Sequence, residues 1–278
     1  MRTTSDKLRP DALDASRHPM MTDRARSDAL RARKSLGRRA GILYLLLALT
    51  GMFAEVVVRG KVYVPDDATA TASRIAEHVT LMRAGIVSDI VQATLFVFLG
   101  LTLSKLLREV SRSAAAAIVV FTSVGAGLIL LNLVFQWGAL LVATKSSYAA
   151  AFGADGRHSL ALLLMDLHHY GYTIGGVFFG LWLLPVGYVG YRFGLLPRVL
   201  SVLLIIACFV WILSTLVAFA FPDADSLVTA VISAPTIIAE FWLIGYLLSV
   251  GVRAPDPTSA DLKGTMRPDD MVSSGSAQ

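Results

Sequence analysis

Charged residues and cysteines are scarce in this chain of 278 residues. Asp, Glu, Lys and Arg make up 16% of the chain, whereas they make up about 25% of an average soluble protein. Hydrophobic residues make up 55%. Cys208 is the single cysteine, so an intramolecular disulfide is excluded. This composition argues against a soluble globular domain and indicates a protein that lies in a membrane.

Sequence motifs for nucleotide binding and serine hydrolysis are also missing. No Gly-x-x-x-x-Gly-Lys loop occurs, which argues against an ATP-driven pump in a single chain. No Gly-x-Ser-x-Gly turn occurs either. A signal peptide is not expected, because the first apolar stretch follows a hydrophilic tail of about forty residues rather than a short basic region. The sequence therefore predicts no cofactor, and it assigns membrane insertion to the first apolar segment.

Long apolar runs fill most of the chain between Ala40 and Val250. Each run has about the length that a bilayer requires, and each is expected to be a helix, because a backbone in lipid must satisfy its own hydrogen bonds. The predicted fold is an all-α, polytopic transmembrane helical bundle with six spans. The spans are predicted at Gly41–Val58, Gly85–Leu103, Ala114–Val142, Leu160–Val189, Val199–Phe221 and Leu227–Val250.

The chain ends flank this bundle as two tails. Residues 1–38 are predicted to be disordered up to about Ser27 and then to form a basic amphipathic helix, residues 39–252 form the six-span domain, and residues 253–278 are predicted to be disordered. Six spans place nineteen Lys and Arg on the side of the termini and six on the other. The positive-inside rule therefore predicts a multi-pass plasma-membrane protein with both termini in the cytoplasm. The basic first tail is expected to lie against anionic lipid and not to bind nucleic acid.

The connection between the first two spans carries its own helical pattern. Asp66 or Asp67 can cap a following helix. Apolar residues then recur at helical spacing, while charged residues face elsewhere. The apolar positions are Ile75, Val79, Met82 and Ile86, and the polar ones are Arg74, Glu77 and His78. The pattern predicts an amphipathic helix on the outer membrane surface.

Polar residues within the spans fall late in odd-numbered spans and early in even-numbered ones, so they are expected to converge toward the external side of the membrane. A charge near the bilayer centre costs about 2.5 to 3.5 kcal/mol on insertion scales, so each acid needs a partner or water. Glu240 is expected nearer the middle of the bilayer. The candidate pocket or ligand-binding residues are Glu55, Arg59, Arg83, Asp89, Asn132, Gln136, Asp166, His169 and Glu240, with His168 beside them.

Several ordered landmarks resemble a known family. They are Gly41 to Leu45, Gly51 with Phe53-Ala54-Glu55, Val58-Arg59-Gly60, Val64 to Ala72, Arg83 to Asp89, and Asp166 to Tyr172. The segment from about residue 38 to residue 253 is similar to the bacterial membrane family called domain of unknown function number 4386. This resemblance implies a helical membrane fold and singles out Glu55, Arg59, Arg83, Asp89, Asp166 and His169. It implies no substrate, cofactor or reaction.

Three functions remain open from the sequence. The first is a polar pocket that binds or transports a small molecule or ion, or relays protons, with Glu55, Asp89, Asp166 and His169 at its core. The second is a membrane-embedded metal-assisted hydrolase or lipid-modifying enzyme that uses Asp166 and His169, although no His-Glu-x-x-His motif occurs. The third is a structural or regulatory protein in which the acids only hold helices together. The sequence favours the first and favours a protein that is not an enzyme.

Overall fold

The computed structural model describes residues 11–221 and 226–253, with side chains for residues 27–221 and 234–253. Within these residues every regular element is a helix, so the predicted all-α fold is confirmed. The elements are α1 (Asp11–Met52), η1 (Phe53–Arg59), α2 (Gly60–Val62), α3 (Ala68–Glu77), α4 (Val79–Arg108), α5 (Arg112–Thr144), α6 (Ser146–Leu181), α7 (Leu183–Phe193), α8 (Arg198–Ala220) and α9 (Ser226–Ser249).

Five helical segments of the described chain are long and apolar enough to cross a membrane. The first five predicted spans overlap them in order. The predicted sixth span coincides with α9, whose described part Ala234–Ser249 is a shorter apolar helix. Large apolar side chains such as those of Val56, Leu131 and Phe209 are exposed on the outside of the bundle, as expected for helices that face lipid. The five segments are Ser27–Val62, Val79–Arg108, Arg112–Thr144, Ser146–Phe193 and Arg198–Ala220.

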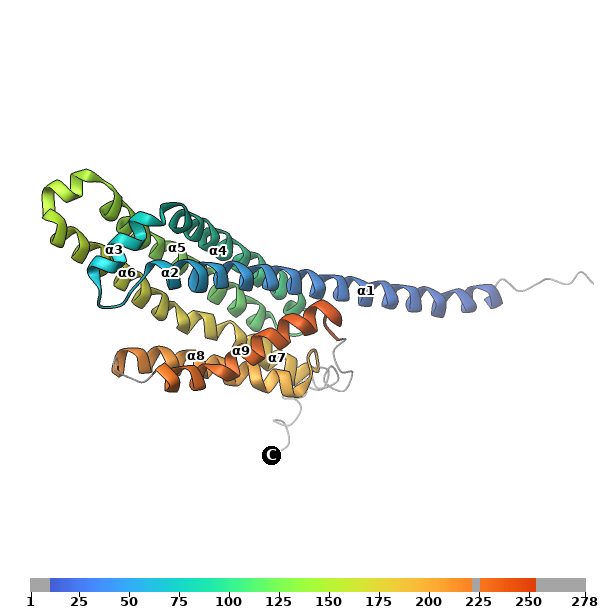
Figure 1. Ribbon diagram of the computed structural model, residues 1–278. Coiled ribbons are helices and arrows are strands. Elements are labelled where there is room, and N and C mark those ends of the chain that lie inside the picture. The colour runs from blue at the N-terminus through green and yellow to red at the C-terminus, as the bar shows by residue number, and fades with distance from the viewer. Residues whose placement is uncertain (1–10, 222–225, 254–278) are drawn as a thin grey trace, which may run out of the picture.

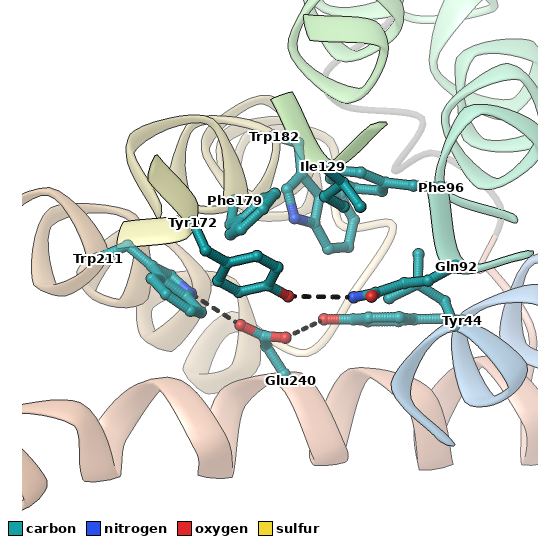
Figure 2. A pocket seen from close by; sticks show the side chains of 10 residues that line it. Tyr44, Gln92, Phe96, Ile129, Tyr172, Phe179, Trp182, Trp211 and Glu240 are labelled. Carbon is teal, nitrogen blue, oxygen red and sulfur yellow. Dashed lines mark hydrogen bonds between the residues drawn. The ribbon is translucent and has the colours of Figure 1, made fainter. Parts of the chain in front are cut away.

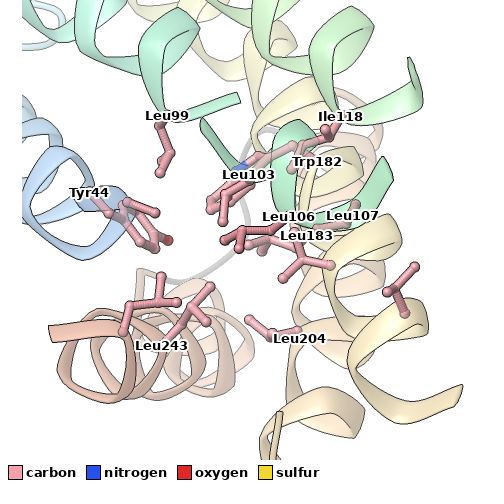
Figure 3. Close-up of a cluster of buried hydrophobic side chains, with 14 of the residues drawn as sticks. Tyr44, Leu99, Leu103, Leu106, Leu107, Ile118, Trp182, Leu183, Leu204 and Leu243 are labelled. Carbon is pink, nitrogen blue, oxygen red and sulfur yellow. The ribbon is translucent and has the colours of Figure 1, made fainter. Parts of the chain in front are cut away.

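The helices pack into one elongated bundle (Figure 1). Helix α4 packs against α1 and α5, α5 packs against α6, and α8 packs against α6, α7 and α9. Helix α9, the last described helix, also packs against α1, the first. Buried leucines and aromatic rings fill the interior, among them Tyr44, Leu103, Trp182, Leu204 and Leu243 (Figure 3).

Helix α1 begins earlier than the sequence suggests. It runs without a break from Asp11, through residues for which the composition favours disorder and then a separate basic helix. Its N-terminal half extends past the other helices (Figure 1). Arg33 on this helix forms an ion pair with Glu109, which follows α4. The basic segment is thus a continuation of the first membrane helix, and this ion pair links it to the end of the second.

Pro185 and Pro235 lie inside the predicted fourth and sixth spans. The fourth span is broken between α6, which ends at Leu181, and α7, which begins at Leu183. Pro185 lacks the N–H that would bond the carbonyl of Leu181 four residues earlier, which explains the break. Pro235 lies inside α9, which is assigned as one continuous helix from Ser226 to Ser249.

Glycines on α6 let α8 approach closely, because small residues allow neighbouring membrane helices to come near each other. A Cβ atom added at Gly180 would lie 2.6 Å from the Cβ of Trp211, and one at Gly176 would lie 2.8 Å from Oγ1 of Thr215. These positions therefore have no room for a larger residue. The close contact places Trp211 beside α6.

Helix α3 lies between the first two spans, where the sequence predicts an amphipathic helix. Asp67 caps it, because its Oδ1 accepts a hydrogen bond from the backbone N–H of Ala70 at 2.8 Å. Ile75 is buried while Arg74 and Glu77 are exposed. The helix ends at Glu77, and α4 starts at Val79 after a non-helical backbone conformation at His78. Val79, Met82 and Ile86 therefore belong to α4 rather than to the amphipathic helix, whose buried face packs on α5 and α6.

Candidate functional site

A π-helical turn places Glu55 and Arg59 at the C-terminal end of the first membrane helix. In η1 the backbone N–H of Gly60 donates to the carbonyl of Glu55, five residues earlier. Such turns are rare and are often found at functional sites. The turn packs closely on α4, because a Cβ at Gly85 would lie only 2.7 Å from Cγ1 of Val58. Gly85 and Asp89 lie four residues apart on one face of α4, so this close approach brings Arg59 beside Asp89.

Arg59 is the centre of the polar cluster. Its Nε donates to Oε2 of Glu55 at 2.6 Å, and its Nη1 donates to Oδ2 of Asp89 at 2.7 Å. A longer bond of 3.5 Å joins Nη1 to Oε1 of Gln136 on α5. The side chains of Arg59 and Asp89 are 6% and 0% exposed, whereas that of Glu55 is 49% exposed. The buried ion pair is therefore Arg59–Asp89, and Glu55 lies at its edge.

Helices α5 and α6 supply the remaining side of the cluster. The Cζ atom of Arg59 lies 5.4 Å from the centre of the Tyr172 ring, within the range of a cation–π contact. His168 lies one turn before Tyr172, and its Nδ1 is 3.0 Å from the backbone oxygen of Asn132. The Asn132 side chain packs on the backbone of Gly171, where a Cβ would lie 2.1 Å from Oδ1. Glycine at this position thus lets the amide enter the interface between the two helices.

Four buried side chains of this cluster each keep a polar atom that has no hydrogen-bond partner among the described residues. The atoms are Nη2 of Arg59, Oδ1 of Asp89, Nδ2 of Asn132 and Nε2 of His168. They come from η1, α4, α5 and α6. Two of them are donors and two are acceptors, because Nδ1 of His168 donates to the backbone oxygen of Asn132 and Nε2 of the neutral ring then accepts. Buried polar atoms normally have partners, so these four atoms leave hydrogen-bonding capacity unused within the described residues.

Asp166 and His169 gather at Tyr63 and not at Arg59. The hydroxyl of Tyr63 donates to Oδ1 of Asp166 at 2.7 Å, and the rings of Tyr63 and His169 are 5.9 Å apart. Burial first, and then the hydrogen bond to Asp166, raise the pKa of the Tyr63 phenol above its ordinary value. His169 is exposed and Asp166 is partly buried. This pair ties the connection after α2 to α6.

Glu240 belongs to a second group of residues further along the bundle. Its carboxylate accepts hydrogen bonds from Tyr44 Oη at 2.7 Å and from Trp211 Nε1 at 2.9 Å. These residues line a cavity of about 100 Å³ (Figure 2). Gln92 and Tyr172 also line the cavity and are joined by a bond of 3.3 Å from Nε2 to Oη. Because Tyr172 contacts Arg59 as well, it connects the cavity to the Arg59 cluster.

The candidate residues therefore lie in separate groups rather than in one pocket. Arg59, Glu55, Asp89 and Gln136 meet directly. The backbone oxygen of Asn132 bonds His168 next to this group. The side chain of Arg83 is exposed on α4 and forms no hydrogen bond or ion pair with another described residue.

Sequence reasoning missed several contributors that helical spacing could have found. Tyr172 follows His168 by four residues and Gln92 follows Asp89 by three, so each shares a helix face with a polar partner. The sequence favours His169 as a candidate, whereas the structure buries His168 and leaves His169 exposed. For Tyr63, Tyr44 and Trp211, no pattern of polar residues in the sequence pointed to a role in a site.

The described residues contain no group of three or more His, Cys, Asp or Glu side chains arranged to hold a metal ion. A metal-assisted hydrolase built on Asp166 and His169 would need a third protein ligand. The described part of the chain therefore gives this hypothesis no support.

A multi-pass bundle of apolar helices that encloses an ion pair and several amides defines a polytopic integral membrane protein. The family model described as Domain of unknown function (DUF4386) matches residues 39–251. The chain belongs to this family, so the resemblance seen in its sequence landmarks is confirmed. No curated protein and no solved structure matches the chain.

Proposed function

We propose that this protein binds a small polar solute at an intramembrane site centred on Arg59, as the recognition step of transport or sensing. The observation that carries the proposal is the set of four unpaired polar atoms on Arg59, Asp89, Asn132 and His168. Because the set contains donors and acceptors, the solute both accepts and donates hydrogen bonds. The site residues act as binding groups, and no covalent step is assigned to them.

The proposal places the site near the outer surface of the plasma membrane. In this arrangement α9 is the sixth span, since its 24 residues extend about 36 Å at 1.5 Å per residue. The distribution of Lys and Arg supports termini in the cytoplasm. The pairing of Arg33 with Glu109 puts the start of the first span and the end of the second on one side of the membrane, as this topology requires. Helix α3 then lies at the outer surface beside the site.

A purely structural role is the competing explanation, and Asn132 separates the two. The backbone oxygen of Asn132 bonds His168, whereas the amide Nδ2 is unpaired. Asn132→Leu keeps the backbone bond and the branched shape while removing the unpaired donor. If the cluster only supports the fold, this change is neutral or stabilising, because a buried polar atom without a partner costs about 1–3 kcal/mol. If the cluster binds a solute, the change removes a contact to it.

The test uses the full chain in lipid nanodiscs and a panel of amino acids, sugars, carboxylates and inorganic ions. We expect at least one class to raise the free energy of unfolding of the wild type, by about 2.7 kcal/mol when the solute is at 100 times its Kd. The gain should be lost in Asn132→Leu. It should be kept in Thr94→Val, which removes an exposed hydroxyl on α4 that bonds only its own helix.

Two results would overturn the proposal. In the first, no solute of the panel stabilises the wild type. In the second, the same solute stabilises Asn132→Leu as strongly as the wild type, which places binding elsewhere on the protein.

A further inference from the structure

The cavity beside Glu240 has a wall of aromatic rings. It lies among residues of α1, α4, α5, α6, α8 and α9, with Trp182 at the junction between α6 and α7 (Figure 2). Several rings contact one another edge to face, such as Phe96 with Trp182 at 5.8 Å and Phe179 with Trp211 at 5.9 Å between ring centres. Ring faces carry partial negative charge, so such a wall attracts cations. The six aromatic residues are Tyr44, Phe96, Tyr172, Phe179, Trp182 and Trp211.

The carboxylate of Glu240 lies in this wall without a positive partner. No Lys or Arg of the described residues forms an ion pair with it. The hydroxyl of Tyr44 and the indole N–H of Trp211 fix its two oxygens in place, one bond to each. Each carboxylate oxygen can accept a further bond. The side chain is thus held in position with spare capacity to accept.

Gln92 adds a second acceptor to the same cavity. Its Nε2 donates to Tyr172, while its Oε1 is buried and has no partner among the described residues. Gly51 gives this side chain its place, since a Cβ there would lie 2.6 Å from Nε2 of Gln92. The cavity therefore combines an unpaired amide oxygen, a carboxylate and aromatic faces. An occupant that satisfies all three donates hydrogen bonds, carries positive charge and has apolar groups.

We propose that this cavity binds a small organic ammonium ion, with the ammonium group against Glu240 and Gln92 and its carbon atoms against the rings. A dry cavity of about 150 Å³ holds benzene, so the smaller cavity here admits about three to five non-hydrogen atoms. The inference goes beyond the proposed function. It requires only the residues around Glu240 and stands whether or not Arg59 binds a solute.

The test measures the binding of ethylammonium and tetramethylammonium to the full chain in nanodiscs. Trp182 and Trp211 line the cavity, so tryptophan fluorescence reports occupancy directly, and thermal unfolding gives a second readout. We expect saturable binding of at least one ammonium ion and no saturable response to ethanol or acetate, which match ethylammonium in size and lack positive charge.

Variants assign the binding to the cavity. Glu240→Gln should weaken ammonium binding at least tenfold, whereas Glu77→Gln, which changes an exposed acid on α3, should leave it unchanged. If Glu240→Gln fails to fold, Phe179→Leu keeps an apolar side chain, removes one ring and should weaken binding severalfold. Asn132→Leu should bind ammonium as the wild type does, which separates this cavity from the Arg59 site.

The inference is overturned if neither ammonium ion binds the wild type saturably. It is also overturned if ethanol binds as well as ethylammonium, or if binding is unchanged in every folded variant of the pair Glu240→Gln and Phe179→Leu.

Discussion

Nη1 of Arg59 lies 2.7 Å from Oδ2 of Asp89, and both side chains are almost fully shielded from the surroundings. The two residues come from different helices, and together they form a neutral pair. Here Nη2 of Arg59 and Oδ1 of Asp89 both stay unpaired among the described residues, beside the free atoms of Asn132 and His168.

Removing Asp89 should be far more damaging than removing Glu55. Asp89→Ala leaves the Arg59 charge buried without its main partner, and the loss of one partner of a buried pair costs about 3–5 kcal/mol. Glu55 is half exposed, so Glu55→Ala should cost less than about 1 kcal/mol. Unfolding of the two variants in the same detergent gives the comparison. Equal losses would show that Arg59 depends on both acids alike.

The close packing of η1 on α4 should depend on Gly85. In Gly85→Ala the new methyl group meets Val58, and overpacking of this kind costs about 1–3 kcal/mol. Gly127→Ala is the matched control, because a Cβ at Gly127 has no atom within 4 Å in the described structure. This control should be neutral or stabilising by up to about 1 kcal/mol. Adding Val58→Ala to Gly85→Ala should restore much of the lost stability, and a failure to do so would argue against the contact as the cause.

Stability should fall at high pH in a way that depends on Tyr63. The pKa of this phenol is raised in the folded protein, whereas in the unfolded chain it is about 10. Above that pH the unfolded chain releases the proton while the folded chain keeps it, so the folded state loses stability as the pH rises. Tyr63→Phe should make the decline above about pH 10 shallower. Identical pH profiles for the variant and the wild type would contradict this account.

The helices were largely predictable because their signal is local. Runs such as Ala114–Val142 are apolar throughout, and a backbone in lipid has few alternatives to a helix. The break before Pro185 and the cap at Asp67 also follow from single residues. The π turn at Glu55 was not predictable from local sequence. It contains Val58, which packs on Gly85, and these two residues lie far apart in the sequence.

The site was only partly predictable for the same reason. The positions of the polar residues along the predicted spans indicated that they converge near one side of the membrane. Arg59, Asp89 and Gln136 do meet. Depth along a helix does not fix the direction in which a side chain points. His168 is therefore buried in the cluster while the adjacent His169 is exposed, since neighbouring residues on a helix point about 100° apart.

Accessibility of Asn132 to a small solute is the most direct test of the solute site. Cys208 is the single cysteine, so Cys208→Ala gives a background in which one new cysteine can be labelled. Asn132→Cys places it in the cluster, and Leu133→Cys is a control at the same depth on α5 that is also buried. In intact membranes, 2-aminoethyl methanethiosulfonate should label Asn132→Cys and leave Leu133→Cys unlabelled. Equal resistance of both positions to the reagent would contradict a site that solutes enter.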